Sequence, residues 1–85
     1  MRTFDYTVRN PKGIHVRPIM DLQGIVSESK CKVVVTKGTN SANVMNLVGM
    51  IMLNILQGDK VTVTTKGENE DSISTDIEMF FDLNF

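Results

Sequence analysis

Apolar and polar residues alternate at the beginning of the chain. Phe4, Tyr6 and Val8 are separated by single polar residues, a period of two that is typical of a β-strand with one buried face. The turn-forming residues Asn, Pro, Lys and Gly follow at positions 10–13, and they predict the end of this first strand.

Two later segments repeat their apolar residues at helical spacing. The first runs from Val16 to about Ser27, and Pro18 is compatible with its first turn, where a missing amide hydrogen costs nothing. The second begins after Asn69, a residue type that caps helices, and carries acidic side chains in its first turn, beside the positive end of the helix dipole. The apolar faces of the two helices consist of Ile19, Leu22, Ile25 and Val26, and of Ile73, Ile77, Phe80 and Phe81.

The middle of the chain predicts a β-hairpin and a further strand. Cys31–Thr36 is rich in β-branched residues, and a turn at 37–39 lets residues 40–44 return as the second arm. Lys60–Lys66 alternates valine with polar residues, and we expect it to form a central strand.

Between the hairpin and this strand, Met45–Leu56 is almost wholly apolar. We predict a short helix there, ended by Gly58. Twelve residues are too few to span a membrane, so either the helix is covered on all sides or one face forms an exposed apolar patch. The element order β-α-β-β-α-β-α indicates an α+β fold, with an antiparallel or mixed sheet and helices packed on one face.

Length and composition restrict the classes of protein to consider. The chain has 85 residues, of which 41% are hydrophobic and 22% charged, and we expect a single domain over residues 1–85. A net charge of −1 without a basic cluster argues against nucleic-acid binding. Cys31 is the only cysteine, so we expect no disulfide and no metal site, and we assign it a buried strand position as a small hydrophobe. A signal peptide and a membrane-spanning run are not recognisable, which predicts a cytoplasmic protein.

The only histidine, His15, lies between Gly13 and the start of the first predicted helix. A lone histidine is more often structural than functional, but here the helix amides of Val16 and Arg17 and the positive end of the helix dipole favour a bound anion. The Arg17 guanidinium suits phosphate oxygens, Pro18 stiffens the turn, and Gly13 permits a close backbone approach. A largely neutral imidazole keeps a lone pair that can attack phosphorus. Since the nearby sequence holds no second acid, base or metal cluster, a phosphoryl carrier is a better interpretation than an enzyme.

The residues Gly13-Ile14-His15-Val16-Arg17-Pro18, with this chain length and element order, resemble the histidine-containing phosphocarrier protein (HPr) family of the bacterial phosphoenolpyruvate:sugar phosphotransferase system. The resemblance implies an open-faced β-sandwich of four antiparallel strands and three helices. It also implies that His15 is phosphorylated on Nδ1 by enzyme I and passes the group to an enzyme IIA domain, with Arg17 contacting the phosphoryl group. No cofactor is implied other than this covalent group. The carrier would meet the membrane only through its partners, and we expect a monomer.

The chain departs from the family pattern at a regulatory position. Asn46 stands where many family members have a phosphorylated serine, so this switch should be absent, whereas a helix-capping role survives.

The chain also departs from the family in its docking surface. We expect partners to contact Leu47, Val48 and Ile51 of the short helix, together with Met20, while Met50 and Leu53 face the core; the alternative is that all of them are core residues. Lysines frequent in the family are replaced by Gly24, Ser27, Asn40 and Met45, which weakens charge complementarity with an acidic enzyme I surface. Two functions are therefore favoured: a phosphocarrier for the sugar branch or the related nitrogen branch, and a binding module that docks on a regulator or metabolic enzyme. An unrelated anion-binding α/β domain or an autonomous enzyme is the remaining alternative.

Overall fold

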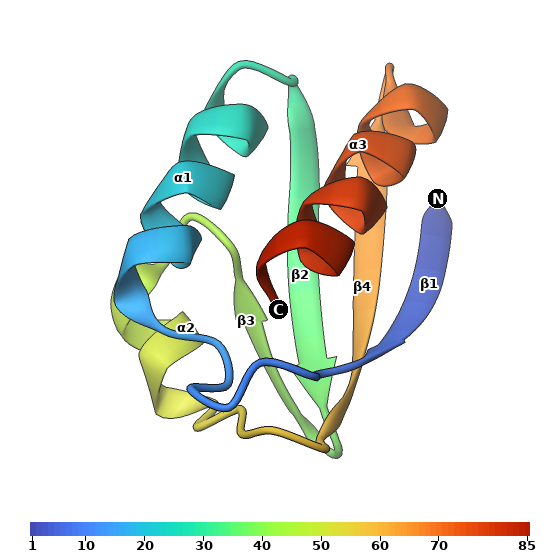
Figure 1. Cartoon of the computed structure of the whole chain (residues 1–85). Coiled ribbons are helices and arrows are strands. Elements are labelled where there is room, and N and C mark those ends of the chain that lie inside the picture. Colours follow the sequence, from blue (N-terminus) through green and yellow to red (C-terminus); the bar gives the residue numbers. More distant parts are fainter.

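Four strands and three helices form the fold of residues 1–85, all of which a computed structural model describes. Their order is β1 (Arg2–Thr7), α1 (Val16–Ser27), β2 (Cys31–Lys37), β3 (Asn40–Asn43), α2 (Leu47–Met52), β4 (Lys60–Gly67) and α3 (Glu70–Asn84). The strands form one sheet in the order β1-β4-β2-β3, and every neighbouring pair is antiparallel. The helices cover one face of this sheet and leave the other open (Figure 1). The predicted α+β open-faced sandwich and the central position of β4 are confirmed.

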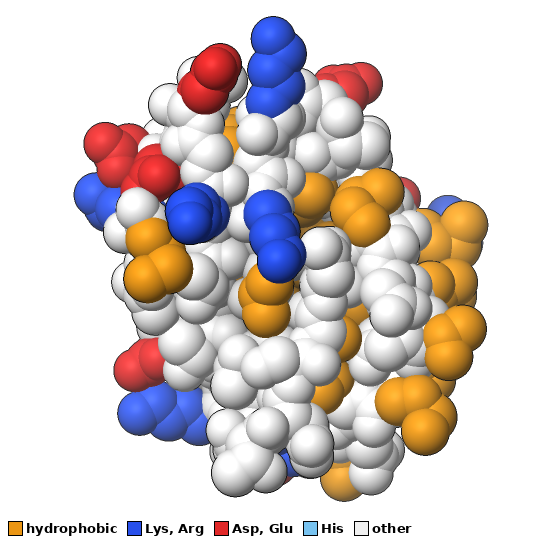
Figure 2. Space-filling model, turned by 180° about the vertical axis from the view of Figure 1, so that it is seen from behind, with side chains coloured by type: hydrophobic (Ala, Val, Ile, Leu, Met, Phe, Trp, Pro, Cys, Tyr) orange, Lys and Arg blue, Asp and Glu red, His pale blue; other side chains and the backbone are white.

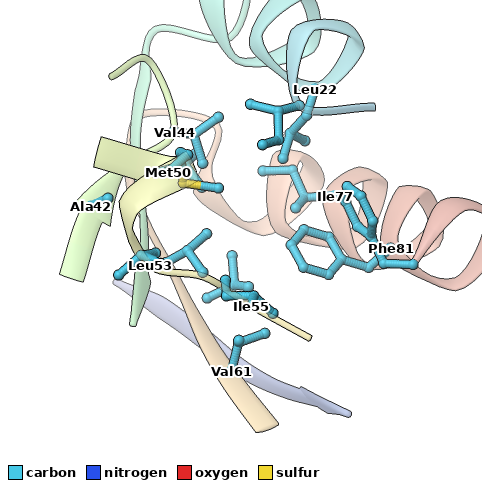
Figure 3. Packing of buried hydrophobic residues seen from close by; sticks show 14 of the residues in the cluster. Leu22, Ala42, Val44, Met50, Leu53, Ile55, Val61, Ile77 and Phe81 are labelled. Carbon is cyan, nitrogen blue, oxygen red and sulfur yellow. The ribbon is translucent and has the colours of Figure 1, made fainter. Parts of the chain in front are cut away.

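The core lies between the sheet and the helices. Alternate residues of the two central strands point inward, and Val33, Val35, Val61 and Val63 are fully buried. They meet the apolar stripes of α1 and α3, as expected from the helical spacing of these residues (Figure 3). Phe81 of α3 packs edge-to-face against Phe4, Tyr6 and Phe85, with ring centroids 4.9–5.7 Å apart. Both predicted long helices are therefore fixed to the sheet by their apolar faces.

The short helix α2 is half the length that the sequence predicts. Asn46 caps it, because its side-chain oxygen accepts a hydrogen bond from the Gly49 amide at 3.0 Å. This confirms the predicted capping role of Asn46 and moves the helix start to Leu47. The prediction of a helix over Met45–Leu56 is too long at both ends.

The end of α2 is set by Asn54 and not by Gly58. Asn54 adopts a left-handed conformation with φ of 50°, which asparagine tolerates better than most residues. The chain then turns so that Ile55 is buried. Gly58 lies in the following turn, where its amide donates to the Val8 carbonyl at 2.8 Å. The predicted helix stop at Gly58 is therefore wrong: the helix ends four residues before Leu56, and the chain leaves it so that Ile55 enters the core.

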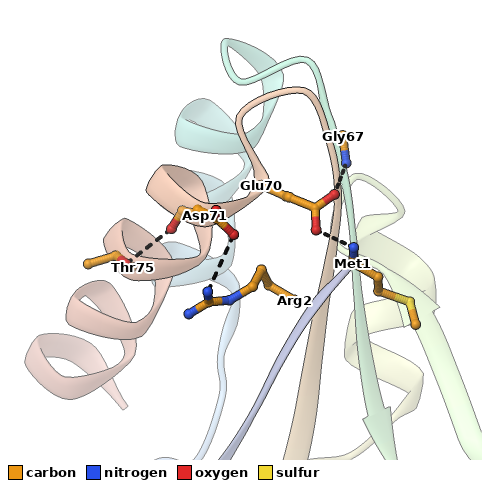
Figure 4. A network of polar contacts seen from close by, with 6 residues as sticks. All are labelled: Met1, Arg2, Gly67, Glu70, Asp71 and Thr75. Carbon is orange, nitrogen blue, oxygen red and sulfur yellow. Dashed lines mark hydrogen bonds and ion pairs between the residues drawn. The ribbon is translucent and has the colours of Figure 1, made fainter.

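Helix α3 begins after Asn69, but the Asn69 side chain makes no capping hydrogen bond. The Glu70 carboxylate instead accepts a long hydrogen bond from the Gly67 amide, at 3.4 Å. Figure 4 shows that Glu70 also pairs with the amino group of Met1, and that Arg2 pairs with Asp71. These contacts join the first strand to the start of the last helix.

Two further findings concern single sequence features. Cys31 is half-buried at the first position of β2, opposite Gly67, so the prediction of a buried position is wrong; the end of the sheet leaves the side chain partly uncovered.

The longest helix has 15 residues. None of the helices combines the length and the apolar character that a membrane-spanning helix needs.

Candidate functional site

His15 is the residue that caps the start of α1, with extended backbone angles (φ −127°, ψ 171°) and no capping hydrogen bond from its side chain. The first hydrogen bond of the helix runs from the Ile19 amide to the His15 carbonyl. The amides of Val16 and Arg17 come before this bond, where helix amides lack an intrahelical acceptor, and Pro18 has no amide hydrogen to satisfy. A half-buried imidazole and two helix amides thus lie at the same end of α1.

Two basic side chains lie close to His15 in the sequence. Arg17 is exposed on the first turn of α1, and Lys12 is exposed in the preceding loop. The five ion pairs of the structure include neither of them. Both cations are therefore available to an anion near the imidazole.

A shallow pocket of about 260 Å³ adjoins the imidazole. Arg17 does not line it, whereas Lys12 does. Sequence reasoning missed Lys12, although a cation three residues before the histidine was visible. It also missed the opposite wall, which comes from the segment between α2 and β4 and carries no recognisable motif. The lining residues are Lys12, Ile14, His15, Val16, Ile51, Asn54, Ile55 and Leu56.

Position 13 must be glycine because its backbone lies directly against this opposite wall. Its φ is +66°, and a Cβ atom at this position would lie 2.2 Å from the Ile55 carbonyl oxygen. The same oxygen accepts a hydrogen bond from the Ile14 amide at 3.1 Å. The sequence predicts that Gly13 lets the backbone approach a phosphate; in the structure it lets the backbone approach Ile55, and this contact places the His15 loop.

The imidazole itself is held loosely. Its Nδ1 atom lies 3.5 Å from the Gly13 carbonyl oxygen, which is the long limit for a hydrogen bond. A contact of this length does not fix which ring nitrogen carries the proton. The tautomer decides which ring nitrogen presents its lone pair, and this contact leaves both tautomers accessible.

Lys37 and Asp59 hold the opposite wall of the pocket in place through hydrogen bonds to its backbone. The Asp59 Oδ2 atom accepts hydrogen bonds from Lys37 Nζ and from the Leu56 amide, each at 2.8 Å. Lys37 Nζ also donates to the Asn54 carbonyl at 2.8 Å. The Lys37 hydrogen bond, followed by that of the Leu56 amide, lowers the pKa of Asp59 below its ordinary value of 3.8. The pattern of the sequence did not reveal this pair, because 22 positions separate its members.

The predicted docking residues divide into exposed and half-buried ones. Val48, Ile51 and Met20 are 69%, 48% and 56% exposed, and Met52, which the sequence analysis did not single out, is 77% exposed. Leu47 is half-buried and packs against the core, so only part of its side chain is available for the predicted outward contact. Met50 and Leu53 are buried as expected. The four exposed residues, Met20, Val48, Ile51 and Met52, are called the apolar face below.

The apolar face contrasts with the open face of the sheet. Figure 2 views the molecule from the side opposite to that of Figure 1 and shows several basic side chains over the sheet. Hydrophobic side chains gather along the margin where α1 and α2 lie. No three His, Cys, Asp or Glu side chains come together as they would around a metal ion. The chemistry that the site offers is a ring nitrogen, two helix amides and two cations beside an apolar surface.

Comparison with known proteins extends this description. A family model described as "PTS HPr component phosphorylation site" matches residues 2–82. The phosphocarrier protein HPr of Lysinibacillus sphaericus is 32% identical over 71 residues, which cover 84% of this chain and 81% of that protein. The phosphocarrier protein NPr of Shewanella violacea is 27% identical over 79 residues, covering 93% and 87%.

Comparison with solved structures agrees with this family in the fold. The crystal structure of HPr-C-His from Thermoanaerobacter tengcongensis matches with a TM-score of 0.88 at 21% identity, covering 96% of this chain and 92% of that one. The identity is too low for this match to show more than the fold, which is that of HPr. The family model covers nearly the whole chain, including the histidine and the helix start that the site is built from. The protein therefore belongs to the HPr family of phosphocarriers of the phosphotransferase system.

Proposed function

We propose that this protein carries a phosphoryl group on His15, which it accepts from enzyme I of a phosphotransferase system and passes to an enzyme IIA domain. The observation that carries the proposal is the position of His15. It is the only histidine of the chain and the cap of α1, within a family whose model describes a phosphorylation site.

In the loading step, a ring nitrogen of neutral His15 attacks the phosphorus atom of the donor. The new N–P bond forms while the bond between phosphorus and the donor breaks, and the electron pair of that bond stays on the donor. The family resemblance assigns the attack to Nδ1, in which case the ring proton resides on Nε2. The long contact to the Gly13 carbonyl opposes this tautomer only weakly.

The charge of the transferred group is met by the residues around the ring. The amides of Val16 and Arg17 point out of the helix start and favour the phosphoryl oxygens. The Arg17 guanidinium and the Lys12 ammonium have no competing ion pair and add positive charge. In the unloading step a nucleophile of the next protein attacks phosphorus, and His15 leaves with its electron pair. The chain then acts as a carrier without its own substrate turnover, and it needs no cofactor.

The apolar face supplies the contact with these partners. Exposed apolar side chains beside the reactive ring bury area on docking, which favours association. Since Met20, Val48, Ile51 and Met52 carry no charge, we expect the salt dependence of association to come mainly from Lys12 and Arg17 beside the ring. Asn46 provides no hydroxyl group for a serine kinase, so the carrier would not be switched off at this position.

A labelling experiment tests the proposal. The protein is incubated with labelled phosphoenolpyruvate and enzyme I from its own host, in separate reactions for the sugar-branch and nitrogen-branch enzymes. We expect an acid-labile, base-stable phosphate that is absent in His15→Ala. Because the chain has no other histidine, any phosphohistidine identifies this position.

Enzyme I activity is verified with an established carrier in the same reaction mixture. No label on the wild-type protein from either active enzyme I would rule out the carrier function and favour the binding module. Label that persists in His15→Ala would rule out His15 as the acceptor.

A further inference from the structure

We propose that Lys37 and Asp59 are positioning residues for His15: by holding the segment between α2 and β4, they fix the wall against which the His15 loop is built. The kinetic consequence of this inference rests on the proposed carrier function, whereas its structural consequence does not. Neither residue touches the imidazole.

The first step of the argument is the geometry of Lys37. Its Nζ atom lies 2.8 Å from Asp59 Oδ2 and 2.8 Å from the Asn54 carbonyl oxygen. Both charged side chains are about one-third exposed, at 32% and 31%, so water screens this pair less than a fully exposed one. The lysine thus ties the two ends of the segment 54–59 to the end of β2.

The second step is the segment itself. Asp59 Oδ2 accepts from the Leu56 amide at 2.8 Å, and the Asp59 amide donates back to the Leu56 carbonyl at 3.0 Å. The Asp59 carbonyl accepts from the Val8 amide at 2.9 Å. Asp59 therefore closes a tight turn and attaches it to Val8, directly after β1, where the chain leads into the His15 loop.

The third step connects this turn to His15. Ile55 lies between Asn54 and Leu56, which are the two residues that Lys37 and Asp59 hold by their backbone atoms. The Ile55 carbonyl oxygen accepts from the Ile14 amide at 3.1 Å and lies against Gly13. Three successive residues of this wall, Asn54, Ile55 and Leu56, line the pocket beside His15. A displacement of the wall is therefore passed to the backbone of Gly13 and Ile14, directly before His15.

Another lysine–aspartate pair provides a matched control. Lys60 lies 3.5 Å from Asp5, with side chains that are 68% and 55% exposed. It hydrogen-bonds no residue of the segment 54–59, and Thr62 already holds Asp5 at 2.8 Å. Lys60→Met removes the same charge and one ion pair as Lys37→Met without releasing the wall.

The structural test measures hydrogen exchange of the Ile14 amide by NMR on the full chain. In Lys37→Met we expect this amide to exchange about tenfold faster, because its acceptor is held less firmly, while amides of the central strands exchange as before. The ring signals of His15 should shift as well. Lys37→Arg should restore both readouts, because arginine can still pair with Asp59, and Lys60→Met should leave both unchanged.

The kinetic test measures phosphoryl transfer to the carrier at several carrier concentrations. Lys37→Met should lower the rate at saturation by about tenfold and change the half-saturating concentration much less, since the apolar face is intact. Lys60→Met should transfer like the wild type.

The outcomes separate the two proposals. Unchanged exchange at Ile14 and unchanged His15 signals in Lys37→Met would overturn the positioning role. So would an equal acceleration at Ile14 and in the central strands, because it would indicate a general loss of stability. If the wild-type protein accepts no phosphoryl group at all, the carrier function fails, while the exchange and ring signals still decide the role of Lys37 and Asp59.

Discussion

Arg17 and Gly13 differ in how much the sequence reveals about them. The G-x-H-x-R-P motif pointed to both, but only contacts in space tell their roles apart. Gly13 has a positive φ and no room for a Cβ atom beside Ile55, a constraint set by a residue 42 positions away. Arg17 is exposed, and its side chain makes none of the ion pairs of the structure. Its presence next to the histidine is therefore best explained by the anion it would bind.

Replacing Arg17 by glutamate tests this role. Arg17→Glu should slow phosphoryl transfer by about 100-fold, because it removes a positive charge and places a negative one beside the developing phosphoryl charge. The free energy of unfolding should change little, since the side chain is exposed. Transfer is measured with phosphorylated enzyme I, and stability by urea unfolding.

Lys66→Glu is the matched control for this charge reversal. Lys66 is exposed on β4, opposite Lys32, and forms no ion pair. Its replacement makes the same change in net charge away from the site. If both variants slow transfer equally, net charge and not a local contact explains the effect.

Among the elements, α2 is where sequence-based prediction succeeded least. Its composition gave the right type of element but the wrong length, because an apolar run does not say which residues leave the helix to fill the core. The left-handed Asn54 ends the helix, and the turn that follows places Ile55 in the core. The strands β2, β3 and β4 were predicted to within one residue at each end, whereas β1 begins at Arg2, two residues before Phe4. Alternation of apolar and polar residues fixes which face of a strand is buried but does not show where an exposed strand end begins.

The outward side of α2 yields a prediction about docking. Val48→Glu should weaken partner binding at least tenfold, because it places a charge in the middle of the apolar face. The free energy of unfolding should change by less than about 0.5 kcal/mol, since the Val48 side chain is mostly exposed. Binding is measured by titration with the isolated enzyme IIA domain or enzyme I.

Leu47→Glu gives the contrasting result. Leu47 packs against the core, so this variant should lose stability as well as binding. Unimpaired binding by Val48→Glu would show that partners dock elsewhere.

For the molecule as a whole, the Lys37–Asp59 pair makes stability depend on pH. The pKa of Asp59 is lowered from 3.8 in the folded protein, so the folded state favours the carboxylate more than the unfolded chain does. This stabilisation is fully present above pH 3.8 and is lost as the pH falls through the folded-state pKa.

Asp59→Asn should therefore be less stable than the wild type at neutral pH, and the difference should shrink as the pH falls below 3.8. Urea unfolding at a series of pH values measures this. Asp21→Asn serves as the comparison, because Asp21 is an exposed residue of α1 without an ion pair. A constant difference between Asp59→Asn and the wild type across the series would contradict the assigned interaction.

The strand order also governs when the site can exist during protein synthesis. Strand β1 is made first, yet its only neighbour in the sheet is β4, which ends at Gly67. At roughly 5–20 residues per second, the ribosome needs roughly 3–12 s to make the sixty residues from Val8 to the end of β4 at Gly67. Throughout this time Phe4 and Tyr6 lack their complete strand partner, and for most of it the loop that carries His15 also lacks the Ile55 carbonyl that holds it. A nascent chain therefore presents its histidine early, but presents a formed phosphorylation site only when almost all of the sequence has left the ribosome.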